Sequence, residues 1–203
     1  DPVAAWVPGF ERYGKGGITI RHLLTHVSGL RPDVDLGEPW KGYDAAIELA
    51  KAAVPQSRPG ARFVYSDINF FLLGHIVSTI SGVPFETFVK TRIFDPLKMK
   101  DTQFLPPAAL RARIAPTEKC TPYGWPCTGP DMAMLRGTVH DPTARRMGGV
   151  AGHAGLFTTA DDLARFCRML LEGGALDGAR VLAPLTVARM IAPSTPPGER
   201  NLR

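Results

Sequence analysis

Apolar residues recur along this chain at spacings of three and four residues, which is the pattern of helices with one buried face. The strongest run predicts a helix over residues 67–80, which Ser66 or Asp67 can cap and Gly82 can end. Its apolar positions are Ile68, Phe71, Leu72, Ile76 and Ile80. This helix is the most strongly predicted element of the sequence.

Further helices are predicted where a capping residue or a proline precedes an apolar run. They begin at or next to Thr19, Asp44, Pro84, Thr159 and Pro184. The side chains expected to face a core from these helices include Leu23, Ile47, Ala50, Val54, Phe85, Phe88, Phe166 and Met169. Helical signals therefore run through most of the chain.

Strand signals are scarce. The clearest extended piece covers residues 61–65, and a turn is predicted at Asp177-Gly178. Between residues 105 and 153 the chain has seven prolines and little periodicity. A loop of that length inside a compact domain usually has a function or is covered by neighbouring structure.

These elements predict a mostly helical fold class for residues 1–203. A helix buries its apolar stripe against another layer, yet the sequence contains almost no sheet that could provide one. Either the helices pack on each other as a small bundle, or the covering layer lies outside residues 1–203. The way the chain begins and ends favours the second alternative, so we expect one partial domain, with a long loop over 105–153, rather than a complete enzyme.

Composition and charge exclude several classes of protein. The chain is 44% hydrophobic and 21% charged, as in ordinary globular proteins, and no apolar run is long enough to cross a membrane. The net charge is +5 and the pI about 9.3, but the basic residues are scattered among acidic ones. Nucleic-acid binding would need them clustered on one face, so we expect no nucleic-acid partner.

The three cysteines give open alternatives. Cys120 and Cys127 flank a segment with proline and glycine, so they could close a small disulfide loop if the protein is exported, for example to the periplasm, or remain free thiols. Cys167 lies among apolar neighbours of the helix after Thr159, and we predict that it is a core residue. No Cys and His residues have the spacing of a zinc site.

The candidate chemistry lies at Tyr65-Ser66-Asp67, between the extended piece and the strongest helix. A tyrosine at this place is next to the positive end of the helix dipole, which favours an anion. With a lysine nearby, such a tyrosine could take and return a proton. By position alone, however, a tyrosine before a helix cap is more often structural.

Four blocks of the sequence, in order, resemble the serine β-lactamase and penicillin-binding-protein superfamily, in its class C β-lactamase and esterase branch. Tyr65-Ser-Asp67, followed by a helix with Leu73-Gly74, is similar to the second motif of that family, Tyr-x-Asn. The other three blocks are Ile18–Leu30, which contains Leu-Leu-Thr-His-Val-Ser-Gly-Leu, Ile93-Phe-Asp-Pro-Leu-Lys-Met99, and Gly152–Phe166, which contains Gly-Leu-Phe-Thr-Thr-Ala-Asp-Asp-Leu-Ala.

The resemblance implies a helical domain packed on an α/β domain with an antiparallel sheet, of which residues 1–203 would supply most of the helices and almost none of the sheet. It implies a serine hydrolase that acts through an acyl-enzyme on an ester, a β-lactam or a D-amino-acid peptide, without metal or cofactor. Tyr65 would be the general base or proton relay. Asp67 would orient the lysine and the substrate.

Two motifs of that superfamily are not found in residues 1–203. None of the serines has a lysine three positions later, so the nucleophilic Ser-x-x-Lys is missing, and no Lys-Thr-Gly occurs. His153-Ala154-Gly155 imitates the latter motif, but it precedes a capped helix. We therefore interpret it as the glycine-rich loop that enters this helix, and we expect the chain to be inactive alone.

Asp67 departs from the asparagine of the resembled motif. An ionised carboxylate only accepts hydrogen bonds, so it cannot donate to an amide carbonyl as asparagine does. It also adds negative charge near Tyr65. This departure weakens the case for β-lactam or peptide cleavage and favours ester hydrolysis.

The histidines add little. His22 and His26 are four residues apart on a predicted helix, but Leu23 stands where a metalloprotease motif needs glutamate, so capping or hydrogen bonding is the expected role. His75 and His140 have no partner pattern, although His140 could border a pocket.

Two other functions stay open at the level of sequence. The chain could be a non-catalytic relative that binds or assembles, or a basic nucleic-acid-binding domain. The expected partner is a small-molecule or peptide substrate.

Overall fold

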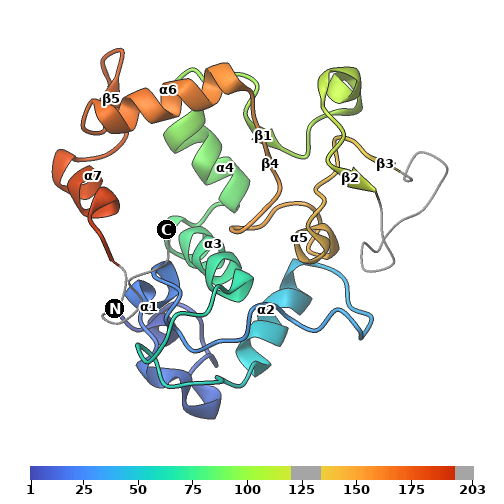
Figure 1. The fold of residues 1–203 in the computed structure, drawn as a ribbon, viewed down its shortest axis with the longest axis vertical. Coiled ribbons are helices and arrows are strands. Elements are labelled where there is room, and N and C mark those ends of the chain that lie inside the picture. Colours follow the sequence, from blue (N-terminus) through green and yellow to red (C-terminus); the bar gives the residue numbers. More distant parts are fainter. Residues whose placement is uncertain (120–133, 195–203) are drawn as a thin grey trace.

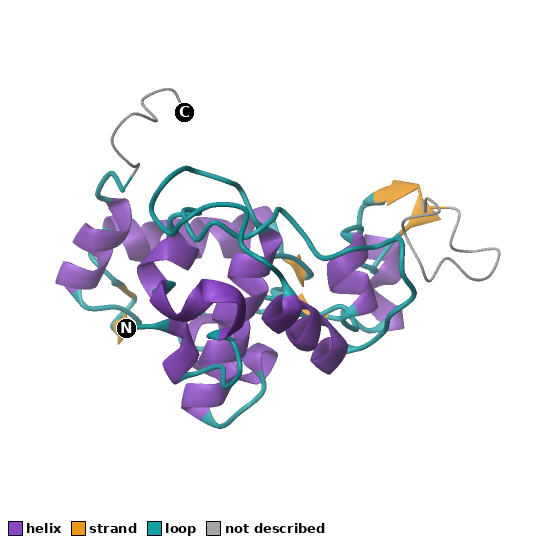
Figure 2. Ribbon diagram, turned by 90° about the horizontal axis from the view of Figure 1, so that it is seen from below, coloured by secondary structure: helices purple, strands orange, loops and turns teal. Residues whose placement is uncertain are grey.

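A computed structural model describes residues 1–119 and 134–194 (Figure 1). Helices predominate (Figure 2). The α-helices are α1 (Ile20–Leu24), α2 (Tyr43–Ala52), α3 (Asp67–Ser81), α4 (Phe85–Val89), α5 (Pro142–Arg146), α6 (Ala160–Leu171) and α7 (Pro184–Ile191). Shorter 3-10 segments cover Val3–Ala5, Arg12–Gly17 and Ala108–Arg113, and a π-helical turn, Lys90–Phe94, continues α4.

The described strands are two residues each and pair into three small antiparallel sheets. Strand β1 (Gln103–Phe104) pairs with β4 (Leu156–Phe157), and β2 (Glu118–Lys119) pairs with β3 (Met134–Leu135). The hairpin of β5 (Ala175–Leu176) and β6 (Ala179–Arg180) turns at Asp177-Gly178, both with positive φ, as predicted. In register, Gln103 lies opposite Phe157 and Phe104 opposite Leu156.

The larger hydrophobic core joins α1, α2, α3 and α5 with the N-terminal segments. Helix α3 lies at its centre (Figure 1) and buries Ile68, Phe71, Leu72 and Ile76, which confirms the predicted face. Ile80, predicted to be buried with them, is 58% exposed because it lies in the last turn of α3, beyond the packed neighbours. Gly82 ends the helix in a left-handed conformation, as expected.

A second core joins α4, its π-helical turn, α6 and the β5–β6 hairpin. Its buried residues include Phe94, Leu97, Met169 and Leu176, with Phe166 and Leu170 packed against them. Thr159 caps α6 by accepting a hydrogen bond from the Asp162 N–H, as predicted. Cys167, predicted to be in the core, is exposed, because the buried face of α6 is centred on Met169.

Three further expectations are corrected or extended. Residues 61–65 run without strand pairing, because the hydrogen bonds of this stretch go to a loop instead of a neighbouring strand. Helix α2 ends at Ala52, so Val54 lies outside it and is 60% exposed. The described parts of the predicted long loop contain Ala108–Arg113, β2, β3 and α5.

Helix α5 begins at Asp141-Pro142, where the Asp141 side chain accepts a hydrogen bond from the Ala144 N–H. We did not predict this short helix from the sequence, although a proline at the first helical position is a recognised signal for the start of a helix. Cys120 and Cys127 lie outside the described residues.

No single helix among residues 1–119 and 134–194 is both long and apolar enough to cross a membrane. Only the pair Asp67–Ser81 and Phe85–Phe94 reaches that length and composition together, and the two are bent by 76°. Most of the apolar residues of α3 are buried in the larger core.

Candidate functional site

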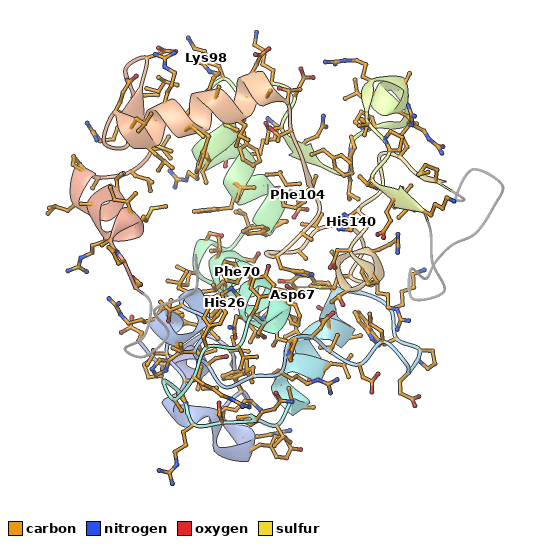
Figure 3. The ribbon with its side chains drawn as sticks, viewed as in Figure 1. His26, Asp67, Phe70, Lys98, Phe104 and His140 are labelled. Carbon is orange, nitrogen blue, oxygen red and sulfur yellow. The ribbon has the colours of Figure 1, made fainter. Side chains whose placement is uncertain are left out.

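Tyr65, Ser66 and Asp67 form the turn that leads into α3. The Tyr65 side chain is 64% exposed, and its ring stacks on that of His26 with 4.5 Å between centroids. The His26 ring also stacks on Phe70, at 5.0 Å, and meets the edge of Phe63, at 5.6 Å. Figure 3 shows Asp67 beside Phe70 and His26 near the centre of the molecule, well away from Lys98 near α6. The ring stack supports Tyr65 from one side and leaves it accessible.

Hydrogen bonds to the loop over residues 26–32 hold this turn. The Ser66 N–H donates to His26 Nδ1 at 3.0 Å, and the Ser66 hydroxyl donates to the Arg31 carbonyl at 2.7 Å. The Asp67 N–H donates to the Pro32 carbonyl at 2.7 Å. Two of the sequence blocks are therefore locked together at the candidate site.

His26 is neutral in this arrangement. Its Nδ1 accepts a hydrogen bond from the backbone, and burial lowers the pKa of its imidazole. Nearby, the fully buried Asn69 accepts a hydrogen bond from the Ser28 hydroxyl at 2.7 Å. We did not single out Asn69 from the sequence, although a polar residue within the buried stretch of an apolar helix was a signal for it.

Asp67, the first residue of α3, is half-buried, and a second carboxylate and an imidazole face it. One ligand atom from each of Asp67, Asp141 and His153 lies within 4.8 Å of the others. This is the only such group of possible metal ligands among the residues that the structure describes. A divalent cation could be held by two carboxylates and one imidazole.

His153 is anchored on Asp141. Its Nε2 lies 3.0 Å from Asp141 Oδ1, the same oxygen that caps α5, and its side chain is 4% exposed. Its other ring nitrogen, Nδ1, is buried and has no hydrogen-bond partner in the described part of the chain. The Phe71 ring packs edge-on against the imidazole at 5.7 Å.

The three carboxylates around His153 differ in the direction in which their pKa values are shifted. Burial raises the pKa of Asp67, and the charges of Asp33 and Asp141 add to that rise while His153 opposes it. Burial likewise raises the pKa of Asp33, although the Thr143 hydroxyl donates to it at 2.6 Å. Burial would also raise the pKa of Asp141, but the hydrogen bonds from His153 and the Ala144 N–H lower it below its ordinary value.

Close backbone packing positions the loop that carries His153. Gly152 passes over α3 at Gly74, where a Cβ on Gly152 would lie 2.1 Å from the Phe70 carbonyl oxygen. A Cβ on Gly74 would lie 3.2 Å from the Gly152 backbone. Only glycine permits this approach, which brings His153 to the N-terminal part of α3.

A cavity of about 750 Å³ borders this site. His153 forms part of its wall together with the Ala108–Arg113 segment, residues 114–117 and the β1–β4 pair. His140 also lines it, in agreement with the expectation that this residue borders a pocket. His153 therefore belongs both to the wall of the cavity and to the group of side chains at Asp67.

The other histidines have structural contacts. His22 Nδ1 accepts from the Thr19 N–H in a capping box at the start of α1, so His22 and His26 both serve in hydrogen bonds, as expected. His75 packs its ring against Tyr43. His153-Ala154-Gly155 leads through β4 into the capped helix α6, which agrees with its interpretation as an entry loop.

Comparison with known proteins gives the family. The sequence model of the Beta-lactamase family matches residues 1–202. A protein of Salmonella heidelberg, named as a candidate D-alanyl-D-alanine carboxypeptidase, is 31% identical over 211 residues, which cover 93% of this chain and 48% of that protein. The chain thus spans about half the length of the curated relatives it matches.

Solved structures show the same fold. A candidate β-lactamase from Bacteroides dorei aligns with a TM-score of 0.67 and 27% identity, over 95% of this chain and 48% of that one. The octameric penicillin-binding-protein homologue from Pyrococcus abyssi aligns with a TM-score of 0.70 and 22% identity, over 95% and 42%. The chain belongs to the Beta-lactamase family, and it has the β-lactamase/transpeptidase-like fold.

Proposed function

We propose that this protein is a serine hydrolase that forms an acyl-enzyme on an ester, a β-lactam or a D-amino-acid peptide. Tyr65 relays the proton between the nucleophilic serine, its lysine and the leaving group. Asp67 orients that lysine and the substrate. The serine and lysine belong to a Ser-x-x-Lys segment that residues 1–203 do not contain, so the proposal concerns the protein in which such a segment adjoins Tyr65.

The observation that carries this proposal is the fixed, accessible position of Tyr65. Its ring is supported by His26, and the backbone on its C-terminal side is held by hydrogen bonds to Arg31 and Pro32. The Tyr65 side chain is 64% exposed and so accessible to a substrate, while the contacts of its ring and backbone limit its motion. That combination suits a proton relay, because catalysis depends on preorganised geometry.

The chemistry of Asp67 makes an ester the preferred substrate. As a carboxylate, Asp67 accepts hydrogen bonds from an ammonium group but does not donate one to an amide carbonyl. A D-amino-acid peptide remains among the proposed substrates, because the names of several relatives refer to D-alanyl-D-alanine carboxypeptidase. The antiparallel sheet of the fold, which we place outside residues 1–203, would supply the facing wall of the site.

The test uses the full-length protein and its Tyr65→Phe variant with an acetyl ester, a chromogenic β-lactam and a D-Ala-D-Ala peptide. We expect kcat/KM on the best substrate to fall about 10²- to 10⁴-fold in the variant, because a general acid–base group contributes about that much. The melting temperature should stay constant, because the hydroxyl of Tyr65 has no hydrogen-bond partner among the described residues. Intact-mass spectrometry should show an acylated serine.

The matched control is Tyr13→Phe, another exposed tyrosine, which should leave kcat/KM unchanged. Full activity of Tyr65→Phe would refute the relay role. Absence of acylation with all three substrates would refute the hydrolase proposal itself. Equal activity of Asp67→Asn and wild type on the ester and the β-lactam would show that Asp67 does not select substrates.

A further inference from the structure

The carboxylate of Asp67 stands at the candidate site without a hydrogen bond in the described residues. Such a half-buried carboxylate is costly when ionised and has no fixed direction. Where asparagine would be neutral, Asp67 brings a charge that the protein must balance or neutralise. The side chains that face Asp67 therefore decide whether its carboxyl group is ionised or neutral when a substrate binds.

The groups that face Asp67 come from three other segments. Asp33 lies in the loop before α2, Asp141 caps α5, and His153 lies on the loop after α5. Of these three, only His153 can carry a positive charge. His153 is also the most confined, because Asp141 fixes its Nε2, Phe71 packs on its ring and Gly152 holds its loop against α3.

We propose that His153 is a positioning residue for Asp67: anchored on Asp141, its imidazole balances the charge of Asp67, so that residue 67 meets the lysine and the substrate as a carboxylate. This inference rests on the proposed function for its catalytic meaning, but the pairing itself is a property of the protein alone. It explains why a half-buried aspartate can stand at this position.

Electrostatics agrees with the geometry. Among the described residues, His153 is the group that lowers the pKa of Asp67, against burial and the charges of Asp33 and Asp141, which raise it. Asp141, which holds His153, has a lowered pKa and so remains an anion over a wide pH range. The unpartnered Nδ1 of His153 gives the imidazole a second nitrogen that Asp141 does not use.

A divalent cation is the competing explanation for the same group of side chains. It would use Asp67, Asp141 and His153 as ligands and would place a double positive charge where the proposed lysine also binds. Charge balance by His153 avoids that conflict and needs no additional component. Titration of Asp67 and of Zn²⁺ binding in wild type and His153→Gln separates the two.

The experiment titrates Asp67 directly in the full-length protein labelled with carboxyl-¹³C aspartate. The Asp67 signal is identified as the one that disappears in Asp67→Asn. In His153→Gln, whose amide can still donate to Asp141 but cannot carry charge, we expect the titration midpoint of Asp67 to rise above that of wild type. A purely structural role of His153 would leave this midpoint where it is.

The matched control is His75→Gln, another partly buried histidine, eight residues along α3 from Asp67 or about 12 Å. It should not move the Asp67 midpoint. An unchanged midpoint in His153→Gln would overturn the proposal. Saturable Zn²⁺ binding that shifts the Asp67 signal in wild type and is lost in His153→Gln would also overturn it, in favour of a metal site.

A second readout connects the pairing to the reaction. On the best ester, the acidic limb of the kcat profile should move to higher pH in His153→Gln and stay in place in His75→Gln, because Asp67 then needs a higher pH to ionise. If the acidic limb of the kcat profile lies at the same pH in His153→Gln as in wild type, the pairing of His153 with Asp67 does not affect catalysis. If no substrate is turned over, the hydrolase proposal fails, whereas the Asp67 titration still decides the role of His153.

Discussion

Charge is placed inside this protein in two opposite ways, by Lys15 and by the Asp67 group, which consists of Asp67, Asp141 and His153. Lys15 is fully buried, and its ammonium donates to the carbonyls of Lys51 and Ala53 at 2.9 and 2.7 Å at the end of α2. Its Nζ also lies 5.3 Å from the centre of the Phe10 ring. Carbonyls at a helix C-terminus attract cations, so every neighbour of this charge favours it.

Asp67 is only half-buried, and the group that it forms with Asp141 and His153 makes only some of its possible hydrogen bonds. The Asp67 carboxylate and the Nδ1 of His153 have no hydrogen-bond partner among residues 1–119 and 134–194. Neighbouring carboxylates also repel one another here. A buried charge that donates two hydrogen bonds and lies against an aromatic ring serves as a structural anchor, whereas polar atoms that lack hydrogen-bond partners next to a cavity indicate a place for a ligand.

The largest expected loss of stability comes from removing the buried ammonium of Lys15. Lys15→Met leaves two partly buried carbonyls without their donor, so the free energy of unfolding should fall by about 3 kcal/mol, measured by urea denaturation. Burial lowers the pKa of Lys15, which partly offsets the value of its charge. Lys100→Met, at an exposed position, is the control and should change little. Equal stability of both variants would mean that Lys15 is not an anchor.

The next effect separates capping from charge at Asp141. Asp141→Ala removes the cap of α5 and the partner of His153, and should cost about 1–2 kcal/mol of unfolding free energy. Asp141→Asn keeps a good capping residue and should cost less. A loss as large in Asp141→Asn as in Asp141→Ala would show that the negative charge, rather than the cap, stabilises this region.

A smaller effect concerns pH. The pKa of Asp67 is raised by burial, so the folded protein binds this proton more tightly than the unfolded one, and the ionised group destabilises the fold. That penalty develops as the pH rises from the unfolded pKa, about 3.9, through the folded value. Asp67→Asn should therefore be more stable than wild type at pH 7, with the difference vanishing below the unfolded value. Thermal melts across pH would detect it, and a constant difference would contradict it.

The smallest effect is expected at Cys167. Because this thiol is exposed on α6, Cys167→Ser should change the unfolding free energy by less than about 0.5 kcal/mol. Met169→Ser, two residues along and fully buried, is the contrasting variant and should cost several-fold more. A large loss of unfolding free energy in Cys167→Ser would instead indicate that Cys167 is a core residue, as predicted from the sequence.

Local signals predicted the helices well because they are written in neighbouring residues. The caps at Thr19 and Thr159 and the left-handed end at Gly82 are set by chemistry within a few residues of each helix end. The exposed Cys167 and Val54 were misjudged because periodicity gives a face but not where the neighbouring elements stop. Tertiary contacts decide that boundary.

The candidate site was predictable only in part for the same reason. Tyr65 and Asp67 could be singled out, since they are two residues apart in one motif, and their catalytic roles stay predictions. The contacts of Asp67 with Asp141 and His153 join positions more than seventy residues apart, and no local pattern links them. His153 was read as part of an entry loop, which it is, but its contact with the candidate site appears only in three dimensions.

The contact between Gly74 and Gly152 sets a rule for exchanging parts of this protein with its relatives. Since the two backbones touch there, a transplanted loop carries its histidine to the right place only if it also brings glycine at the crossing point. The requirement on a helix grafted in place of α3 is weaker, because a Cβ at position 74 would lie 3.2 Å from the Gly152 backbone, a tight contact that a shift of a few tenths of an ångström relieves. In chimeras that keep both glycines, the other residues of the cavity wall can be exchanged. In chimeras that replace Gly152, the loop with His153 would be displaced from α3.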